Sequence, residues 1–171
     1  GTLGPAAAGG EYSGSGVAIL TVTGNLSNPS RGAFDMDVDK FFGFSEVAFD
    51  AGTQFDYQGL QKLGMIAVTT DFPKGGDIHV FEGPLLKDVL AAAGVEGKLL
   101  TVRALDGYLI EAPISEMVAK GAVVAVKRDG TPFAIGDFGP AQIVFPRKER
   151  PELSEMSDDN WVWSIYNIHV E

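Results

Sequence analysis

Thiols, histidine and long apolar runs are all scarce in this sequence. There is no cysteine at all, and the only histidines are His79 and His169. Without thiols the chain has no disulfide, thiolate metal ligand or cysteine nucleophile, and two histidines do not close a structural zinc site without carboxylate help. No apolar run approaches the roughly 18 residues that a spanning helix needs. No membrane span is therefore predicted.

Positive charge is scarce as well. Lys and Arg number 13 against 23 Asp and Glu, which gives a formal net charge of −10. Such a chain repels polyanions, and it has no basic stripe that would release counterions from a phosphate backbone. Nucleic acid is therefore not expected as a partner. A small-molecule ligand remains compatible with the sequence, and the identity of any protein partner stays open.

The composition is that of a globular domain with a small-residue N-terminus. A length of 171 residues favours one domain, and 45% of the residues are hydrophobic. Residues 1–16 carry too little apolar surface to offset the entropy of ordering, so we expect a flexible tail followed by one domain over residues 17–171. The tail resembles a mature N-terminus left by a removed leader, which predicts a periplasmic or secreted protein.

Short strands and a few helices make up the predicted domain. The helices are expected from a cap at Asp56 through residue 63, from Pro84 to a stop at Gly94, and over residues 115–120. The predicted strands, which are β-branched and bounded by turn residues, cover residues 17–23, 46–50, 65–70, 78–81, 99–104, 108–112, 123–127, 132–135, 142–145 and 161–170. Because strands and helices do not alternate regularly, the pattern predicts an α+β fold with a mixed or barrel-like core of short strands and about three helices.

An acidic segment in the N-terminal third of the chain is a candidate metal site. Asp35, Asp37 and Asp39 alternate, and Glu46 follows at the spacing of a calcium loop. The sixth position of such a loop requires glycine for a sharp turn, and here it is Lys40. The segment is therefore interpreted mainly as a solvated acidic stretch, with a cation site as the alternative.

Four motifs follow one another at compact spacing in the second half of the chain. They are FEGPLLKDVL over residues 81–90, ALDGY over 104–108, DFGPAQIVFP over 137–146 and WVWSIYNIHV over 161–170. In this order they resemble the oxidoreductase molybdopterin-binding domain of the sulfite oxidase family, and the resemblance covers residues 17–170. It implies that family's α+β fold and a pterin cofactor of the molybdopterin type.

Departures from the family pattern concern the metal and the anion. The family's molybdenum-ligating cysteine falls near Thr69 or Thr70, and a hydroxyl is a poor substitute for a soft thiolate on a high-valent metal. The arginine that the family carries in the Gly-Pro loop is also missing, since Pro140 is followed by Ala141 and Gln142. The resemblance therefore supports the fold more than the reaction.

The resemblance nevertheless implies a binding pocket between three segments. Its candidate cofactor-binding residues are Thr69, Thr70, Asp71 and Phe72 after one strand, Asp106, Gly107 and Tyr108 in a turn, and Asp137, Gly139 and Pro140 in a loop. Both the turn and the loop also suit a purely structural role. Lys127, Arg128 and Arg147 are the cations nearest in sequence for an anionic tail. Alternation along the last predicted strand places Trp161, Trp163 and Ile165 on one buried face.

Three functions remain open, and none assigns a catalytic residue. The first is an extracytoplasmic binding protein for a pterin or another small molecule that has no redox centre of its own. The second is an oxidoreductase that holds molybdenum through the pterin dithiolene alone. The third is a protein-interaction module without any cofactor. No G-x-S-x-G elbow positions a serine for acyl transfer, so hydrolysis by a serine triad has no support.

Overall fold

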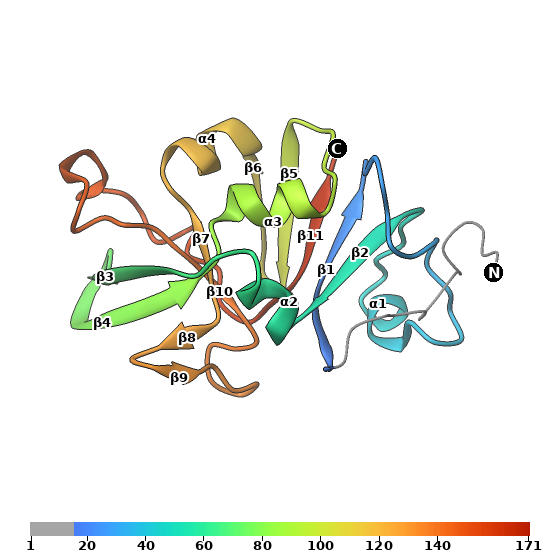
Figure 1. The fold of residues 1–171 in the computed structure, drawn as a ribbon, viewed down its shortest axis with the longest axis horizontal. Coiled ribbons are helices and arrows are strands. Elements are labelled where there is room, and N and C mark those ends of the chain that lie inside the picture. The colour runs from blue at the N-terminus through green and yellow to red at the C-terminus, as the bar shows by residue number, and fades with distance from the viewer. Residues whose placement is uncertain (1–15) are drawn as a thin grey trace.

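The computed structural model describes residues 16–171, so the predicted tail over residues 1–16 lies, except for Gly16, outside the described residues. In the view of Figure 1, the hairpins formed by β3–β4 and β8–β9 lie at one end of the molecule and β1, β2 and α1 at the other. No helix among the described residues is long and apolar enough to cross a membrane.

The largest sheet joins the two ends of the described chain. Its order is β2-β1-β11-β5-β6. Strand β1 pairs with β11 in parallel, and the other neighbours are antiparallel, which makes the sheet mixed. The strands are β1 (Ala18–Gly24), β2 (Gly52–Asp56), β5 (Leu99–Ala104), β6 (Leu109–Pro113) and β11 (Ile165–Val170).

Two smaller sheets complete the strand structure of residues 16–171. One has the order β3-β4-β8-β9, and the other pairs β7 with β10. The strands of these two sheets are β3 (Ile66–Phe72), β4 (Gly75–Gly83), β7 (Val123–Ala125), β8 (Lys127–Arg128), β9 (Thr131–Pro132) and β10 (Gln142–Val144). The α+β class is thus confirmed, but the strands of the described residues do not close into the barrel-like core that was expected, because they divide into three separate sheets.

Helices are short and cap the core rather than form a layer. They are α1 (Lys40–Phe44), α2 (Tyr57–Gln61), α3 (Leu86–Ala92), α4 (Ile114–Ala119) and the 3-10 turn η1 (Pro151–Leu153). The predicted cap is present, since Asp56 Oδ1 accepts a hydrogen bond from Gly59 N at 2.6 Å. Helix α3 buries Leu86, Val89 and Leu90, whose spacing places them on one face of the helix. Helix α1 was not predicted.

Several strand predictions were wrong, either for the whole strand or at one end of it. Residues 46–50 form no strand, and the neighbouring strand is β2 instead. The last strand begins only at Ile165, because Ser164 adopts a left-handed backbone with φ 56° that interrupts regular pairing. Trp161 and Trp163 therefore do not share one buried face. Trp161 is 3% exposed, whereas Trp163 is 44% exposed.

The acidic segment is neither a calcium loop nor fully solvated. Asp39 is buried and pairs with the buried guanidinium of Arg31, and Asp35 Oδ1 accepts a hydrogen bond from Asp37 N. Within residues 16–171 no three His, Cys, Asp or Glu side chains gather in a group that could hold a metal ion. The interpretation as a solvated stretch is therefore wrong for Asp39, because a paired charge at that position is removed from water.

Candidate ligand-binding pocket

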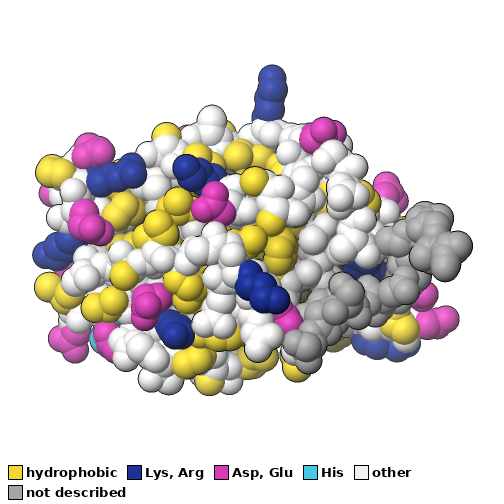
Figure 2. Space-filling view, in the orientation of Figure 1, with side chains coloured by type: hydrophobic (Ala, Val, Ile, Leu, Met, Phe, Trp, Pro, Cys, Tyr) yellow, Lys and Arg dark blue, Asp and Glu magenta, His cyan; other side chains and the backbone are white. Residues whose placement is uncertain are grey.

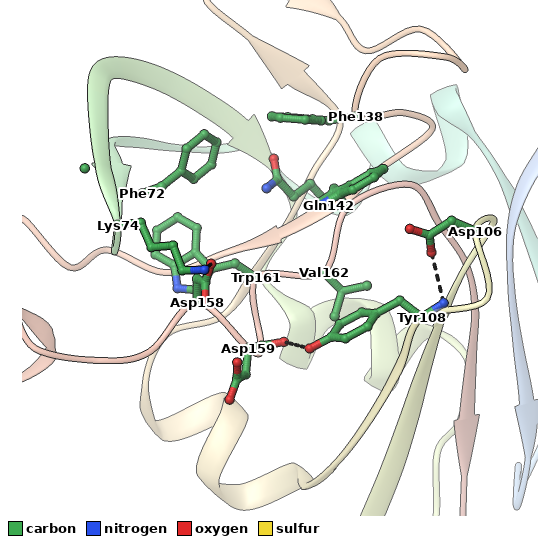
Figure 3. Close-up of a pocket in the computed structure, with 12 residues that line it drawn as sticks. Phe72, Lys74, Asp106, Tyr108, Phe138, Gln142, Asp158, Asp159, Trp161 and Val162 are labelled. Carbon is green, nitrogen blue, oxygen red and sulfur yellow. Dashed lines mark hydrogen bonds and ion pairs between the residues drawn. The ribbon is translucent and has the colours of Figure 1, made fainter.

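A cavity of about 470 Å³ lies between four chain segments. This volume falls in the range of small-molecule sites. Figure 3 shows side chains from all four segments facing the same space. The lining residues are Phe72, Lys74 and Gly75 at the β3–β4 turn, Asp106 and Tyr108 at the β5–β6 turn, Phe138 and Gln142 around the start of β10, and Asp158, Asp159, Trp161, Val162 and Trp163 before β11.

Aromatic rings form a continuous row along this cavity. The ring of Phe72 contacts that of Phe138 with centroids 5.9 Å apart and that of Trp161 at 5.8 Å, both edge to face. Phe138 in turn contacts Trp163 at 5.7 Å. Such rings offer apolar area and a negative π face at the same time. The row can therefore hold a flat or cationic group of a ligand.

Tyr108 closes a second side of the cavity and links two of its segments. Asp106 Oδ1 accepts a hydrogen bond from Tyr108 N at 2.9 Å, and the Tyr108 hydroxyl donates to Asp159 O at 2.9 Å (Figure 3). Gly107 between them has φ 94°, which glycine adopts without steric cost. Burial, together with the nearby carboxylates of Asp159 and Asp158, raises the pKa of Tyr108, so the phenol stays protonated and able to donate.

Backbone hydrogen bonds place residues 162–165 beside residues 138–143, which include part of the Gly-Pro loop. Ile143 N donates to Val162 O at 2.9 Å, Ser164 N to Phe138 O at 2.9 Å, and Ile165 N to Ala141 O at 3.0 Å. This pairing crosses the left-handed turn at Ser164. It brings together segments that are about twenty residues apart in the chain, a distance over which local sequence signals do not act.

The floor of the cavity carries polar atoms that have no partner. Gln142 is 2% exposed and Trp161 is 3% exposed, yet Gln142 Oε1 and Trp161 Nε1 make no hydrogen bond with any described residue. Buried polar groups are nearly always hydrogen-bonded, because leaving one unpaired costs about 1–3 kcal/mol. In Figure 3 the amide end of Gln142 points into the space bounded by Phe72 and Phe138. Two residues that line the cavity thus each keep a buried polar atom without a partner.

Negative charge predominates in the lining. Among the described residues that line the cavity, Lys74 is the one cation, whereas Asp106, Asp158 and Asp159 are acidic, and Asp106 and Asp159 are exposed. Lys74 Nζ lies 3.4 Å from Asp158 Oδ2 and its side chain is 81% exposed. Among residues 16–171, Asp106 and Asp159 have no ion-pair partner within 4.0 Å. The lining therefore carries an excess of negative charge.

The structure brings part of the predicted site together. Phe72, Asp106 and Tyr108 all line the cavity, whereas Gly107 is not among the lining residues. From the Gly-Pro loop, however, the lining residue is Phe138, which was not predicted. Gln142 was also missed as a site residue, although it lies two positions after the Pro140 that ends the expected Gly-Pro motif. The segment over residues 158–159 had no sequence signal.

The threonines near the expected thiolate position lie within an edge strand. Residues 65–70 were predicted to form a central strand with a loop after it, but β3 runs on to Phe72 at the edge of its sheet. Thr69 is exposed. Thr70 is fully buried, and its hydroxyl donates to Asp71 O at 2.8 Å. Neither threonine lines the cavity.

The remaining predicted residues make structural contacts in the segments around the cavity. Asp71 forms an ion pair with Arg147, and Asp137 Oδ2 accepts from Arg128 Nη2 at 2.9 Å. A Cβ on Gly139 would lie 2.5 Å from Ala134 O, closer than real Cβ contacts allow, so glycine is required there by close packing. Pro140 is buried. None of these residues lines the cavity, and their contacts fit the structural interpretation of this loop.

The lining does not fit an anionic pterin of the molybdopterin type. A phosphate is held by cations or by converging N–H groups. Of the three cations expected for this role, Arg128 and Arg147 are engaged by Asp137 and Asp71, and Lys127 does not line the cavity. Lys74 alone faces an excess of carboxylates. A thiolate for molybdenum is absent as well, since the chain has no cysteine. The cavity is an aromatic and acidic site.

Comparisons with known proteins show the fold. No protein-family model matches the chain, and no curated protein matches it in sequence. Among solved structures, it is similar to the sulfane dehydrogenase SoxCD from Paracoccus pantotrophus, with a TM-score of 0.58 and 15% sequence identity. The match covers 88% of this chain and 37% of that chain. At this identity the likeness shows the fold alone, which the chain shares with part of that dehydrogenase.

Proposed function

We propose that this chain is a small-molecule binding protein whose site is the cavity bounded by Phe72, Tyr108, Phe138, Gln142 and Trp161, and that it has no redox centre of its own. The ligand lies against the row of aromatic rings. The observation that carries the proposal is the pair of buried, unpartnered polar atoms, Gln142 Oε1 and Trp161 Nε1. A ligand that bonds to both removes the cost of burying them.

The alternatives account less well for the same features. An oxidoreductase that holds molybdenum through a pterin dithiolene needs a cationic contact for the phosphate, and the one cation among the described lining residues, Lys74, lies 3.4 Å from the carboxylate of Asp158. A protein-interaction module without a ligand gives no reason for a concave aromatic site with unpaired polar atoms on its floor. The fold shared with the sulfane dehydrogenase supports descent of the pocket from an oxidoreductase-like scaffold, while the reaction does not follow from the fold.

Protein-observed NMR with a fragment library tests the proposal. Shift changes should cluster on the resonances of Trp161, Tyr108 and Gln142, and Trp161→Phe should weaken binding. The control is Ile135→Ala, which changes an exposed residue outside the lining. Shift changes that all lie elsewhere would contradict the proposal.

Native mass spectrometry of protein purified from its own host complements the screen. A retained small molecule without molybdenum is expected. Stoichiometric molybdenum with a pterin would favour the oxidoreductase instead. The extracytoplasmic location expected from residues 1–16 remains a prediction, and fractionation of the host cells checks it.

A further inference from the structure

We infer that the cavity selects an organic cation that carries N–H groups and an oxygen acceptor, and that it rejects anions, the phosphate-bearing pterins included. This inference rests on the proposed function, because it specifies the ligand class of the same site. The observations that carry it are the excess of carboxylates in the lining, the row of aromatic rings and the unpaired atoms of Gln142 and Trp161.

Charge is the first argument. The carboxylates of Asp106 and Asp159 have no partner cation among the described residues, and Asp158 faces only the exposed Lys74 at 3.4 Å. Asp106 and Asp159 are exposed, so their attraction for a cation is modest and weakens as salt is added. The field of the whole chain acts in the same sense, since its net charge is −10. An anionic group would meet repulsion both at a distance and in the site.

The aromatic row is the second argument. A cation placed over a ring within about 6 Å of its centroid is attracted by the π face, most strongly by tryptophan. The molecule already uses Phe138 in this way, because the guanidinium carbon of Arg128 lies 5.3 Å from its ring centroid. Arg128 does not line the cavity, and Asp137 neutralises it at 2.9 Å. The charge of Arg128 therefore does not neutralise the acidic residues that line the cavity.

The unpaired atoms define the polar groups of the ligand. The buried Gln142 Oε1 is an acceptor and calls for an N–H donor, whereas the buried Trp161 Nε1 is a donor and calls for an oxygen. A site built to bond a donor discriminates strongly against analogues that lack it, because its own polar atom is then left unpaired. The ligand class is therefore a flat amidinium or ammonium compound with a hydroxyl or carbonyl oxygen, and not a purely apolar cation.

Three compounds of matched shape test the charge preference. They are 4-hydroxybenzamidine, 4-hydroxybenzamide and 4-hydroxybenzoate, which are cationic, neutral and anionic, and pterin-6-carboxylate serves as an anionic pterin. Dissociation constants are measured by NMR titration of the pocket resonances. The amidine should bind at least about tenfold more tightly than the benzoate, with the amide between them, and added salt should narrow the difference.

Isosteric charge removal shows whether the carboxylates cause the preference. The double variant Asp106→Asn, Asp159→Asn keeps the side-chain oxygen that accepts from Tyr108 N and should abolish most of the preference for the amidine. Asp37→Asn removes an exposed carboxylate outside the lining and should leave it unchanged. A preference that survives in the double variant would overturn the role given to these carboxylates.

The outcomes separate the inference from the proposed function. Tightest binding by the amidine supports both. Equal or tighter binding of the benzoate or the pterin at the pocket resonances would leave small-molecule binding intact and overturn the charge selection. Failure of all four compounds to shift any pocket resonance at about 10 mM, the range of the weakest useful fragments, would overturn the proposed function together with the inference.

Discussion

Two polar regions of this molecule are built in opposite ways. Around Arg31, which is fully buried, every strong donor finds an acceptor. Its Nη1 donates to Asp39 Oδ1 at 2.8 Å and its Nη2 to Asp39 Oδ2 at 2.7 Å, while Nε donates to Gly32 O at 3.2 Å. The guanidinium carbon also lies 4.8 Å from the ring centroid of Phe49. This region is closed, because its polar groups satisfy one another.

The cavity, in contrast, is an open region, because some of its buried polar groups have no hydrogen-bond partner. Gln142 and Trp161 are as deeply buried as Asp39, but each keeps a polar atom without a partner. Buried atoms without a partner also occur outside the lining, at Thr53, Gln54, Tyr57 and Arg147, so such an atom points to a ligand only where its residue lines the cavity. Closed groups are costly to remove one at a time, since the partner is then stranded. Open groups cost little to remove in the free protein, because nothing within it depends on them.

The largest expected effect is the removal of one half of the closed pair. Asp39→Ala strands the buried guanidinium of Arg31 and should lower the free energy of unfolding by about 3–5 kcal/mol, measured by urea denaturation. Asp37→Ala changes an exposed carboxylate of the same segment and should stay within about 0.5 kcal/mol of the wild type. Equal losses in the two variants would contradict the closed pair.

Acid should weaken the same pair. Burial raises the pKa of Asp39, but the hydrogen bonds from Arg31 and from the backbone of Asp35 outweigh it and lower the pKa below the ordinary 3.8. The pair therefore stabilises the fold above that value and loses its contribution as the pH falls below it. The Asp39→Ala variant should accordingly lose less stability than the wild type on acidification through this range.

A smaller loss is expected for the ion pair at the pocket wall. Arg147 pairs with Asp71, and both side chains are mostly buried, 14% and 15% exposed. Arg147→Ala should cost about 1–3 kcal/mol, between the values of surface and buried pairs. Lys148→Ala is the matched control, since its Nζ lies 3.9 Å from the same carboxylate and its side chain is 49% exposed. If both variants unfold like the wild type, this wall is not held by the pair.

The pH dependence near neutrality should come from His169. Burial, with a further contribution from Arg103, lowers the pKa of His169 below 6.5. Asn167 Nδ2 donates to Thr23 Oγ1 at 3.1 Å, and the same Oγ1 is hydrogen-bonded to His169 Nδ1 at 2.8 Å. The unfolded chain takes up the proton first, and stability is lost as the pH falls below about 6.5, by at most about 1.4 kcal/mol per pH unit.

Urea titrations at pH 7.5 and 5.5 measure this loss. His169→Gln should remove most of it. His79→Gln removes the other histidine, which lies in an exposed ion pair with Asp129, and should keep it. An unchanged pH dependence in His169→Gln would assign the effect to another group.

Local signals explain what could be predicted of the fold. Helix α3 begins after Pro84 and ends before Gly94, and the β5–β6 turn carries Asp106 and Gly107, so both were recognised from residues a few positions apart. Strand β2 was missed because its residues, GTQFD, have little strand propensity. It forms by pairing with β1, and the register Val22 to Thr53 spans a long stretch of chain.

The same limit applies to the pocket. Asp106 and Tyr108 were predicted from the ALDGY motif and Phe72 from the stretch near the family's thiolate position, and all three line the cavity. Gln142 enters the site because residues 141–143 pair with residues 162–165 across the interruption at Ser164, and no local pattern predicts such an interruption. Nor does sequence tell a satisfied amide from an unsatisfied one, since that depends on every neighbour in space.

The variant with the smallest expected loss of stability, Gln142→Leu, is the sharpest test of the comparison. Gln142→Leu replaces a buried amide with an unpaired Oε1 by an apolar side chain of similar size. In the free protein it should lower the free energy of unfolding by no more than about 0.5 kcal/mol, because removal of the unpaired Oε1 acts in the stabilising direction, and it should abolish the gain in stability on adding 4-hydroxybenzamidine. Urea denaturation with and without the compound measures both.

Asn167→Leu is the matched control, because Asn167 is another buried amide in which every hydrogen bond is made. Its Nδ2 donates to Thr21 O at 2.9 Å and its Oδ1 accepts from Arg103 Nη1 at 2.9 Å. Its replacement should cost about 2–4 kcal/mol, since several polar partners are stranded together. A loss of that size for Gln142→Leu would mean that Gln142 is held within the fold like Asn167, and the distinction between a closed and an open region would fail where it matters most.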